Sequence, residues 1–429
     1  MYIETLYQIF LNSTGICTDT RQLKEGNLYF ALRGPNYNAN SFAMQAVKSG
    51  AIAAVVDEAN YAVPNQIYKV DDTLNVLQAL ARYHRMQMKA KVVALTGSNG
   101  KTTTKELMYA VVSRHYKTIA TIGNLNNHIG VPLTLLRIEA DTEIAIIEMG
   151  ANHQNEIKQL CEIANPDMGL ITNVGKAHLE GFGGFEGVIK GKTELYDYLK
   201  KHQRFVFFNS DNKYLAPYCA NYSYKLSYGN SQSDITGTLL ADTPIKLTWQ
   251  YNQINYQVLM QLVGAYNFEN ILAAIAVGVK LKVPENKINE GLASYIPSNQ
   301  RSQVININSN TILLDAYNAN PTSMQAALIN FDKNYVAPKV VFLGDMYELG
   351  AEEYREHEAI VNLLITSDFS TIVLVGKRFG QFTDKINAHF FSTSEEACKW
   401  AELQNITKSN VFIKGSRSSA MEKVMAAFA

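Results

Sequence analysis

Short apolar runs alternate with helically patterned segments along most of this chain. In the middle of the sequence, apolar runs with the length of buried strands lie at residues 92–95, 144–148, 168–172 and 205–209. Amphipathic stretches separate them, and residues 264–280 carry the pattern of a longer helix. This alternation predicts a mostly parallel sheet with helices on both faces. Polar, alternating sequence near residues 225–258 predicts an antiparallel extension of that sheet.

The same alternation continues on both sides of this region. Before it, strands are predicted at 27–32 and 51–56, with helices at 41–49 and 74–88. After residue 300, the predicted strands are 311–314, 339–343, 371–375 and 410–414, and the predicted helices are 323–331, 352–365, 394–404 and 418–427. We therefore predict an α/β fold of three domains, at residues 1–88, 89–300 and 301–429.

Composition narrows the class of protein without identifying it. The 429 residues are 47% hydrophobic, which is ample for more than one core, and 39 Lys plus Arg balance 39 Asp plus Glu. A net charge of zero argues against a general nucleic-acid binder. The first ten residues lack a basic segment and no apolar run approaches ~20 residues, so neither a signal peptide nor a spanning helix is expected. Four cysteines without CxxC spacing predict free thiols in a reducing compartment, and we expect a soluble, cytoplasmic protein.

The stretch at residues 92–105, VVALTGSNGKTTTK, carries the sharpest chemical signal. An apolar strand breaks at Gly97, and Gly100 directly precedes Lys101 and Thr102 at the start of a predicted helix. Glycines allow backbone N–H groups to approach phosphate oxygens, and a helix N-terminus favours anions. Lys101 would neutralise phosphate charge, and the Thr102 hydroxyl would reach a magnesium ion. The usual loop has a glycine five residues before Gly100, where this chain has Leu95, so this loop is a shorter variant.

Further candidate residues follow other predicted strands or open a helix. Glu148 ends an apolar strand, where a carboxylate can hold magnesium or simply be solvated. His178 lies in a glycine-containing loop after the next predicted strand. It could be a ligand or a structural histidine. Lys192 lies in a basic helical segment, whose plainest interpretation is a solvated face. Asn267 and Asn270 share a helix face and could meet a base edge, although helix capping explains Asn267 equally well.

Two polar groups near the C-terminal strand ends are also ambiguous. Asp315, Asn318 and Asn320 follow a predicted strand and could bind a ribose or a phosphate. These residue types also form turns without any ligand. Ser416 and Arg417 begin the last predicted helix and could bind a carboxylate, or could form a solvated cap.

Taken in order, these segments resemble the Mur ligases of peptidoglycan synthesis over essentially the whole chain. The matching segments are the short loop TGSNGKTT, the EMG strand end, NVGKAHLEGFG, the KGKTEL helix, YNFENILAA and the strand-end aspartate. The resemblance implies an N-terminal α/β UDP-sugar-binding domain, a central P-loop-type parallel-sheet ATPase domain and a C-terminal Rossmann-like α/β domain. It also implies a cytoplasmic enzyme of cell wall biogenesis, on which cell shape and cell division depend.

The resemblance further implies ATP-dependent amide synthesis with Mg²⁺. The segments DAYNANPTSM, LGDMYELG and KGSRSSAMEKV point to the branch of the family that joins D-alanyl-D-alanine to UDP-MurNAc-tripeptide through an acyl phosphate. An Asp-Asn-Pro-Arg loop, which marks the branch that adds diaminopimelate, is absent from the sequence. Neither a nucleic acid nor membrane insertion is implied, and we expect a monomer.

The same resemblance assigns roles to the candidate residues. The groups expected to bind ATP are Gly97, Ser98, Asn99, Gly100, Lys101, Thr102, Thr103, Asn267, Asn270, Arg301, Asp315 and Asn318. Within that set, the asparagine pair would contact adenine, Arg301 a phosphate and Asp315 the ribose. The expected magnesium ligands are Thr102, Glu148, His178 and Lys192, the last as a carbamate. The catalytic groups would be Lys101, Glu148, His178 and Lys192. The expected UDP-sugar contacts are Thr20, Arg21, Asn126 and Asn127, and Ser416 and Arg417 would face the dipeptide.

Two departures and two alternative functions accompany this interpretation. Asn38-Ala39-Asn40 stands where the family often has Asp-Gly-His, and Thr20 replaces the commoner serine. One alternative is a ligase of the same family that adds a single amino acid. The other is a nucleotide-gated binding module without ligase turnover.

Overall fold

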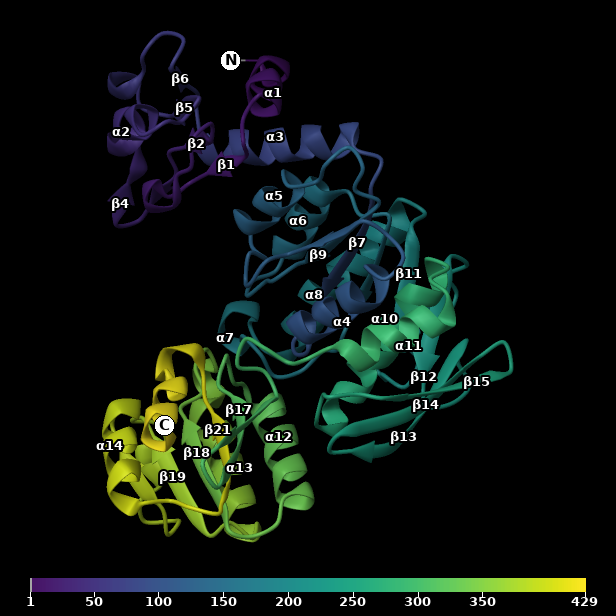
Figure 1. The fold of residues 1–429 in the computed structure, drawn as a ribbon, viewed down its shortest axis with the longest axis vertical. Helices are drawn as coiled ribbons and strands as arrows, with labels where there is room; N and C mark the ends of the chain where they lie inside the picture. Colours follow the sequence, from purple (N-terminus) through teal and green to yellow (C-terminus); the bar gives the residue numbers. More distant parts are fainter. Residues whose placement is uncertain (1) are drawn as a thin grey trace. The chain divides into compact units, whose positions relative to one another are not determined.

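The computed structural model describes residues 2–429, and the chain divides into two compact units. Unit 1 contains residues 2–95, Tyr116–Gly150 and Glu156–Met168. Unit 2 contains Thr96–His115, Ala151–Asn155 and Gly169–Ala429. Figure 1 colours the elements in chain order. Both units are α/β structures with parallel strands, as the sequence predicts.

The first part of unit 1 is a four-stranded parallel sheet in the order β1-β2-β5-β6. Its strands are β1 (Ile16–Cys17), β2 (Leu28–Phe30), β5 (Ala53–Val56) and β6 (Ile67–Lys69). Around it lie α1 (Ile3–Leu11), η1 (Thr20–Gln22), the hairpin of β3 (Arg33–Gly34) and β4 (Tyr37–Asn38), η2 (Ala39–Phe42), α2 (Ala43–Lys48) and η3 (Ala59–Tyr61). The predicted strands at 27–32 and 51–56 are confirmed in shorter form, as Leu28–Phe30 and Ala53–Val56.

The second part of unit 1 contains three parallel strands in the order β8-β9-β7. Its elements are α3 (Thr73–Gln87), β7 (Lys91–Thr96), β8 (Thr118–Ala120), α5 (Gly130–Leu135), β9 (Ile144–Glu148) and α6 (Glu156–Ala164). Asp72 caps α3 by accepting a hydrogen bond from the Asn75 backbone N–H at 2.7 Å. All five residues of β9 are buried, as its continuous apolar sequence predicts for a strand covered on both faces.

The first part of unit 2 carries strands in the order β10-β11-β12-β13-β14-β15. These strands are β10 (Met168–Ile171), β11 (Phe205–Asn209), β12 (Lys225–Gly229), β13 (Ile235–Asp242), β14 (Ile245–Tyr251) and β15 (Ile254–Leu259). The predicted antiparallel extension is confirmed for β13 to β15. It is wrong for β12, which pairs in parallel with both of its neighbours.

The helices of this part include a packed pair, α4 and α10 (Figure 1). The elements are α4 (Lys101–Val112), α7 (Leu179–Phe182), α8 (Phe185–Lys201), α9 (Ala216–Cys219), η4 (Ala265–Asn267), α10 (Phe268–Lys280) and α11 (Glu285–Ser294). Residues 271–277 of α10 are apolar and buried, so the face that meets α4 is part of the core.

The last part of unit 2 is a six-stranded sheet in the order β16-β17-β21-β18-β19-β20, parallel except at β16. Its strands are β16 (Gln303–Ile307), β17 (Asn310–Asp315), β18 (Lys339–Gly344), β19 (Thr371–Val375), β20 (His389–Phe391) and β21 (Asn410–Lys414). Its helices are α12 (Pro321–Asn334), η5 (Gly350–Glu352), α13 (Glu353–Thr366), η6 (Phe379–Phe382), α14 (Ser394–Gln404), η7 (Arg417–Ser419) and η8 (Met421–Phe428).

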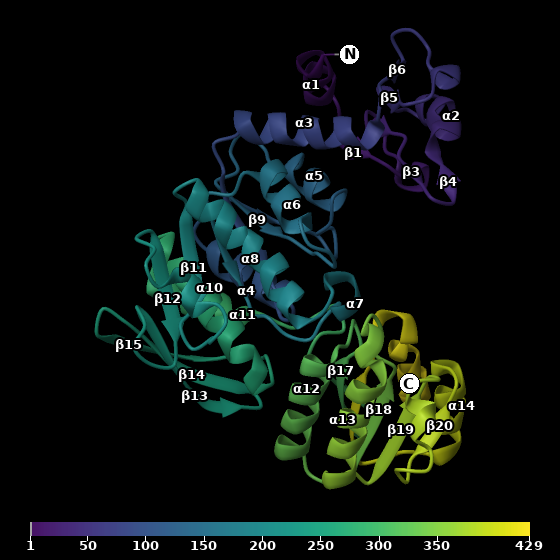
Figure 2. The same cartoon turned by 180° about the vertical axis from the view of Figure 1, so that it is seen from behind.

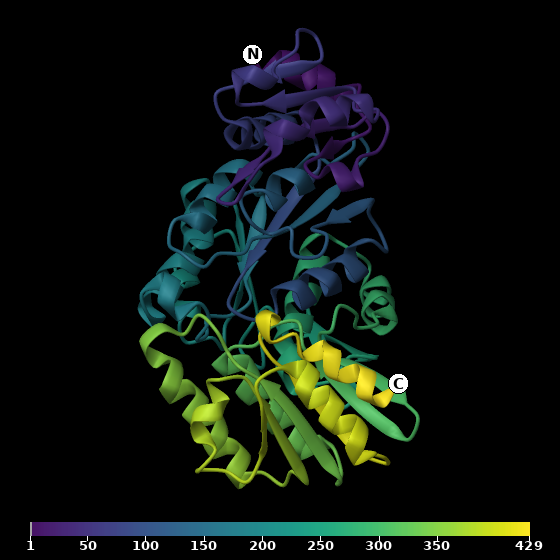
Figure 3. The ribbon, with the colours of Figure 1, turned by 90° about the vertical axis from the view of Figure 1, so that its left-hand side faces the viewer.

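Alternate residues of these strands face two separate apolar layers. Leu313 and Leu343 pack with α12 and α13 on one face, whereas Ile312 and Phe342 pack with α14 and η8 on the other (Figure 2). Figure 3 shows η8 beside α14. The helix predicted at 418–427 is confirmed over Met421–Phe428 as a 3₁₀ helix, and Ala420, with a φ of +46°, separates it from the short 3₁₀ segment Arg417–Ser419.

The parallel strands place their following loops at the carboxyl edge of each sheet, where ligands bind in α/β folds. The loops after β10, β17 and β21 all belong to unit 2 and carry His178, Asn318, Asn320, Ser416 and Arg417. All four cysteines are buried free thiols, as expected. Between residues 2 and 429, no helix combines the length and apolar character that crossing a bilayer requires.

A buried histidine predicts the acid sensitivity of unit 1. His84 in α3 is 3% exposed, and its Nε2 lies 2.8 Å from the Ile138 carbonyl oxygen. Burial lowers the pKa of His84. As the pH falls below ~6.5, His84 therefore binds a proton in the unfolded chain before it does so in the folded chain. The free energy of unfolding decreases over that pH range. We expect the unfolding free energy to fall from pH 7.5 to 5.5, and His84→Gln to flatten that slope, as measured by urea titration. His128→Gln, at an exposed site, is the control, and an unchanged slope in His84→Gln would contradict the assignment.

Candidate active site

The loop between β7 and α4 is a tight phosphate-loop-like turn held by the segment after β10. The Ser98 backbone N–H donates to the Asn173 carbonyl oxygen at 3.0 Å, and the Asn99 N–H donates to Asn173 Oδ1 at 3.0 Å. The Thr172 hydroxyl donates to the Asn99 carbonyl oxygen at 2.6 Å. These bonds fix the first half of the loop, and the second half continues into the N-terminus of α4. A helix N-terminus favours anions, as the sequence predicts for this loop.

Two glycines make this turn possible. Gly97 has a φ of +148°, and a Cβ there would lie less than 3.0 Å from the Thr172 hydroxyl. Gly100 has a φ of +76°, and a Cβ there would lie less than 3.0 Å from the Asn270 side-chain amide. Both positions therefore require glycine for conformation and for space.

Lys101 and the threonines after it open α4. The Lys101 ammonium donates to the carbonyl oxygens of Gly97 and Ser98, at 2.8 and 3.2 Å, so it folds back over the loop. Thr102 is 6% exposed and Thr103 is 8% exposed. The charge of Lys101 thus lies over the turn that would receive the phosphates.

His178 is held by a carboxylate from the C-terminal sheet. It adopts a φ of +54° at the start of α7, and its Nδ1 pairs with Glu348 Oε2. The His178 hydrogen bond lowers the pKa of the Glu348 carboxyl. With Nδ1 engaged in this way, Nε2 is the ring nitrogen that faces other partners, the arrangement that carboxylates impose on metal-binding histidines.

Lys192 is fully buried in α8, which corrects the interpretation of its helix as a solvated face. Its ammonium donates to the Ala151 carbonyl oxygen at 2.9 Å and lies 4.9 Å from the centre of the Phe182 ring. A lysine with no exposed surface is costly unless its charge is compensated or removed. The position therefore has the burial expected of a functional lysine.

Asn267 and Asn270 lie side by side near the phosphate loop. Asn270 Nδ2 donates to Asn267 Oδ1 at 3.1 Å, and Asn270 Oδ1 accepts from the Thr104 hydroxyl at 3.1 Å. Asn267 occupies the N-cap position of α10, but its side chain makes no capping bond. The capping explanation for Asn267 is therefore wrong.

The turn after β17 is organised by Lys414. Its ammonium pairs with Asp315 Oδ2 and donates to the Asn318 carbonyl oxygen at 3.3 Å. Asn318 Oδ1 accepts from the backbone N–H groups of Ala319 and Arg417, at 2.9 and 3.3 Å. Ser416 Oγ donates to the Ala319 carbonyl oxygen at 3.3 Å. The candidate groups after β17 and β21 thus form one cluster.

Two arginines lie against the same tyrosine ring beside this cluster. The Arg301 guanidinium carbon lies 3.8 Å from the centre of the Tyr317 ring, and that of Arg417 lies 5.6 Å from it. Arg301 Nε is buried without a hydrogen-bond partner. The arginine expected to bind a phosphate is thus oriented by stacking.

The candidate residues of unit 1 form two local groups. Glu148 is 1% exposed, so it is not a solvated strand end, and its Oε1 accepts from Asn126 Nδ2 at 2.8 Å. Asn127 Oδ1 accepts from the backbone N–H groups at the start of α5. Thr20 and Arg21 lie in η1, where the Arg21 guanidinium pairs with Asp19 and remains largely exposed.

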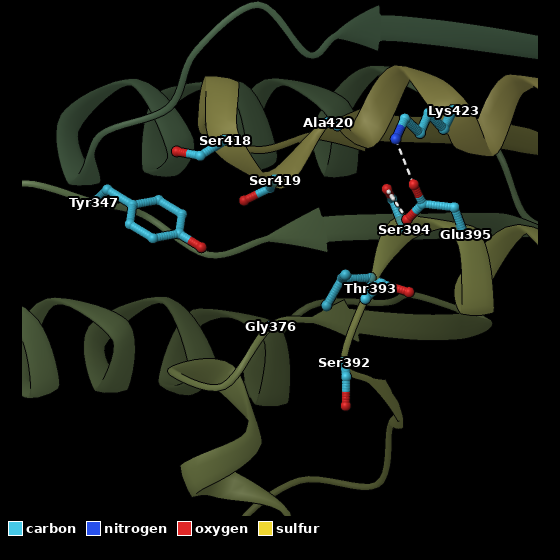
Figure 4. A pocket seen from close by; sticks show the side chains of 11 residues that line it. Tyr347, Gly376, Ser392, Thr393, Ser394, Glu395, Ser418, Ser419, Ala420 and Lys423 are labelled. Atoms are coloured by element: carbon cyan, nitrogen blue, oxygen red, sulfur yellow. Dashed lines mark hydrogen bonds and ion pairs between the residues drawn. The ribbon is translucent and has the colours of Figure 1, made fainter. Parts of the chain in front are cut away.

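A polar cavity of about 170 Å³ lies at the carboxyl edge of the C-terminal sheet (Figure 4). Hydroxyl groups dominate its lining, together with an ion pair between Lys423 and Glu395. The lining residues are Tyr347, Val375, Gly376, Ser392, Thr393, Ser394, Glu395, Ser418, Ser419, Ala420 and Lys423. Ser418, the residue that follows the candidate pair Ser416 and Arg417, is part of this lining.

Sequence reasoning missed the contacts that join the C-terminal sheet to the phosphate loop. Asn320 caps α12 through its Oδ1, as expected of a turn residue, but its Nδ2 also donates to Asn99 Oδ1 at 2.6 Å. The Thr322 hydroxyl accepts from the Lys176 backbone N–H at 3.1 Å, and the Lys176 ammonium pairs with Glu356. An Asn-Pro turn signals the cap, but no local pattern signals a partner more than 200 residues away.

A glycine-dependent loop at a helix N-terminus and polar residues at the carboxyl edges of parallel strands define a nucleotide-binding α/β protein. The Mur ligase middle domain matches residues 95–278, and the domain described as "Mur ligase, glutamate ligase domain" matches residues 300–417. This chain belongs to the Mur ligase family.

Relatives match this chain over nearly its whole length. It is 36% identical to the UDP-N-acetylmuramoyl-tripeptide–D-alanyl-D-alanine ligase of Escherichia coli (strain K12), covering 96% of this chain and 93% of that protein. Its counterpart in Bacillus subtilis (strain 168) is 32% identical, with 96% and 92% covered. The structure matches MurF from Acinetobacter baumannii with a TM-score of 0.90 and 30% identity over 99% and 98% of the two chains. It also matches the MurF ligase of Thermotoga maritima in complex with ADP, with a TM-score of 0.86 and 25% identity over 98% and 97%.

The contact between Gly100 and Asn270 predicts a local effect on nucleotide binding. We expect Gly100→Ala to lower the unfolding free energy by about 1–3 kcal/mol, because alanine is strained at positive φ. Displacement of the loop from Asn270 should also weaken ADP binding about tenfold, measured by calorimetry. Gly183→Ala is a matched control, because Gly183 has a φ of +74° and a methyl group there would meet no atom within 4 Å. Equal ADP affinities in the two variants would contradict a role for this contact.

Proposed function

We propose that this chain is an ATP-dependent ligase that joins D-alanyl-D-alanine to UDP-N-acetylmuramoyl-tripeptide. The observation that carries the proposal is the nearly full-length match to ligases of that printed name, in both sequence and fold. The phosphate-loop turn and its contacts with the C-terminal sheet support this proposal. Unit 2 contains both the candidate nucleotide site and the polar cavity. The product would be UDP-MurNAc-pentapeptide for peptidoglycan synthesis.

The reaction proceeds through two substitutions. The terminal carboxylate of the tripeptide attacks the γ-phosphorus of ATP, which gives an acyl phosphate and ADP. The amine of D-alanyl-D-alanine then attacks the acyl carbon, the amide forms, and inorganic phosphate leaves as the amine loses its proton. Negative charge on the transferring phosphoryl group is the main barrier, so positioned cations supply most of the rate enhancement.

The nucleotide would be bound by the phosphate loop and by residues of α10 and the C-terminal sheet. Gly97 to Thr103 would surround the phosphates, with Lys101 as the neutralising charge. Arg301, stacked on Tyr317, is suited to a phosphate because its Nε is buried and still has a hydrogen to donate. Asp315 and Asn318 would lie at the ribose, and Asn267 and Asn270 at the base. The match to a MurF structure in complex with ADP supports a nucleotide here.

The donor set fits magnesium bound in part by substrate. Across residues 2–429, no three His, Cys, Asp or Glu side chains are grouped as a complete metal cage. Mg²⁺ characteristically takes few protein ligands and completes its shell with phosphates and water. Thr102, Glu148 and His178 would be those few ligands, and the Glu348 contact fixes the His178 tautomer for this purpose. When bound, the ion would neutralise phosphate charge.

Lys192 would serve the same site as a carbamate. An ammonium cannot ligate a cation, whereas a carbamate offers hard oxygen ligands. An uncompensated ammonium with no exposed surface is costly, and conversion to a carbamate would remove that buried positive charge.

The remaining substrates would contact two other groups of residues. Thr20, Arg21, Asn126 and Asn127 would contact the UDP-sugar. Ser416 and Arg417 would meet the dipeptide, and the neighbouring cavity has the polar lining that a zwitterion needs. We propose domain boundaries at residues 1–88, 89–300 and 301–429, a monomeric state and a cytoplasmic location.

A product assay tests the function directly. With ATP and Mg²⁺, we expect phosphate release only when both UDP-MurNAc-tripeptide and D-alanyl-D-alanine are present, and a pentapeptide product by mass spectrometry. Lys101→Ala should lower the rate by ~10³-fold or more by removing charge stabilisation of the phosphoryl group. Product from UDP-MurNAc-dipeptide and a single amino acid would favour the alternative ligase. ATP binding without turnover for any substrate pair would favour a binding module.

The carbamate makes a separate prediction about Lys192. We expect Lys192→Ala to be inactive and to regain part of its activity in the presence of short carboxylates such as acetate or formate, because these can replace the carbamate oxygens. Lys190→Ala, in the same helix, is the control and should need no rescue. Full activity of Lys192→Ala without any additive would remove Lys192 from the site.

A further inference from the structure

A continuous chain of hydrogen bonds leads from the phosphate-loop helix to Asp315. Beyond the Asn270 contacts described above, Asn267 Nδ2 donates to Ser302 Oγ at 3.4 Å. The Ser302 backbone N–H donates to Asp315 Oδ1 at 3.2 Å. Because Thr104, Asn270 and Asn267 lie on one side of Ser302 and Asp315 on the other, Ser302 is the link between the two groups.

Ser302 is held in an unusual conformation at this link. It is 5% exposed and has a φ of +48°, and Asn299 and Gln300 just before it also have positive φ, at +60° and +57°. Positive φ is costly for residues other than glycine, so a cluster of three marks a connection that its surroundings impose. The structure thus maintains a strained backbone where the middle part of unit 2 meets its C-terminal sheet.

A tyrosine completes the connection. Tyr266 Oη lies 2.9 Å from Ser302 Oγ, and Tyr266 directly precedes Asn267. Burial and the nearby Asp315 charge raise the pKa of Tyr266, so its hydroxyl stays protonated. Tyr266 and Asn267, just before α10, therefore hold the Ser302 hydroxyl. The Ser302 backbone N–H is bonded to Asp315.

We propose that Ser302 is a positioning residue that sets Asp315 relative to the asparagine pair, and through it the fit of the ribose relative to the base. Asp315 Oδ2 is engaged by Lys414 and Oδ1 by the Ser302 N–H, and each oxygen keeps a second lone pair that can accept from a ribose hydroxyl. Ser302 itself need not touch the nucleotide. The inference rests on the ATP site of the proposed function and adds the residue that aligns its two halves.

Equilibrium binding of ADP and 2′,3′-dideoxy-ADP to the full chain tests this inference without ligase turnover. Ser302→Ala removes the hydroxyl links to Tyr266 and Asn267 and leaves the backbone N–H in place. We expect its affinity for ADP to fall about 3- to 10-fold, the range of one neutral hydrogen bond, and its affinity for dideoxy-ADP to fall less than about twofold. The reason is that the loss acts through Asp315, which the dideoxy nucleotide cannot use.

Two further variants keep the test interpretable. Tyr266→Phe removes one of the two hydroxyl links and should give a smaller loss with the same preference for ADP over dideoxy-ADP. Ser409→Ala is the matched control, because Ser409, like Ser302, is a buried serine that directly precedes a strand; it is 7% exposed and its hydroxyl donates to the Thr407 carbonyl oxygen. It should alter neither affinity, and thermal unfolding of each variant shows whether the fold is retained.

The outcomes separate this inference from the proposed function. Equal losses for ADP and dideoxy-ADP, or no loss for either, would overturn the positioning role of Ser302. Absence of ligase product from the wild-type chain would instead overturn the proposed function and leave the nucleotide result standing. Wild-type protein that binds the two nucleotides equally would refute the use of Asp315 at the ribose, and with it the inference.

Discussion

The close approach of the phosphate-loop backbone to its neighbours is the constraint on which this structure depends. Gly97 lies against Thr172 and Gly100 against Asn270, with no space for a side chain at either position. These contacts join β10 and α10 to the loop, so one turn determines how three elements converge. The N-terminus of α4 and the Lys101 ammonium lie at this turn, an arrangement that favours an anion.

The attachment of the C-terminal sheet to this loop uses two kinds of interaction. Next to the loop the bonds are neutral, between Asn320 and Asn99 and between Thr322 and the Lys176 backbone. Farther out, the Lys176 ammonium forms an ion pair with Glu356, and His178 Nδ1 is hydrogen-bonded to Glu348. Neutral hydrogen bonds contribute about 0.5–1.5 kcal/mol each. Glu356 is 5% exposed, so leaving its carboxylate without Lys176 would cost more than breaking one of the neutral bonds.

Much of this fold follows from local sequence. The strands at 144–148 and 205–209 end where their apolar runs end, because burial on both faces requires continuous apolar sequence. The two-residue strand β1 and the exposed edge strand β16 were not predicted, since neither carries a continuous apolar run. The parallel pairing of β12 depends on its neighbours in the sheet, and the start of the last helix depends on the single φ of Ala420.

The candidate site shows the same difference between features that local sequence predicts and features that depend on distant residues. Glycine spacing and residue type pointed to the loop, to His178 and to Asp315, because those signals are short-range. The partners of these residues came only from the structure: Glu348 lies 170 residues from His178, and Ser302 reaches Asp315 through its backbone N–H.

Asp315 shows why such partners matter physically. Lys414 is 2% exposed, and a buried ammonium is tolerated only beside a compensating charge. The Lys414 ammonium therefore orients one oxygen of Asp315, and the Ser302 N–H fixes the second oxygen. A carboxylate restrained at both oxygens needs little reorganisation to accept another hydrogen bond, which is the form of preorganisation that binding sites exploit. The acidic residue can be predicted from the sequence, but its restraint depends on a lysine 99 residues later and on a strained link before the strand.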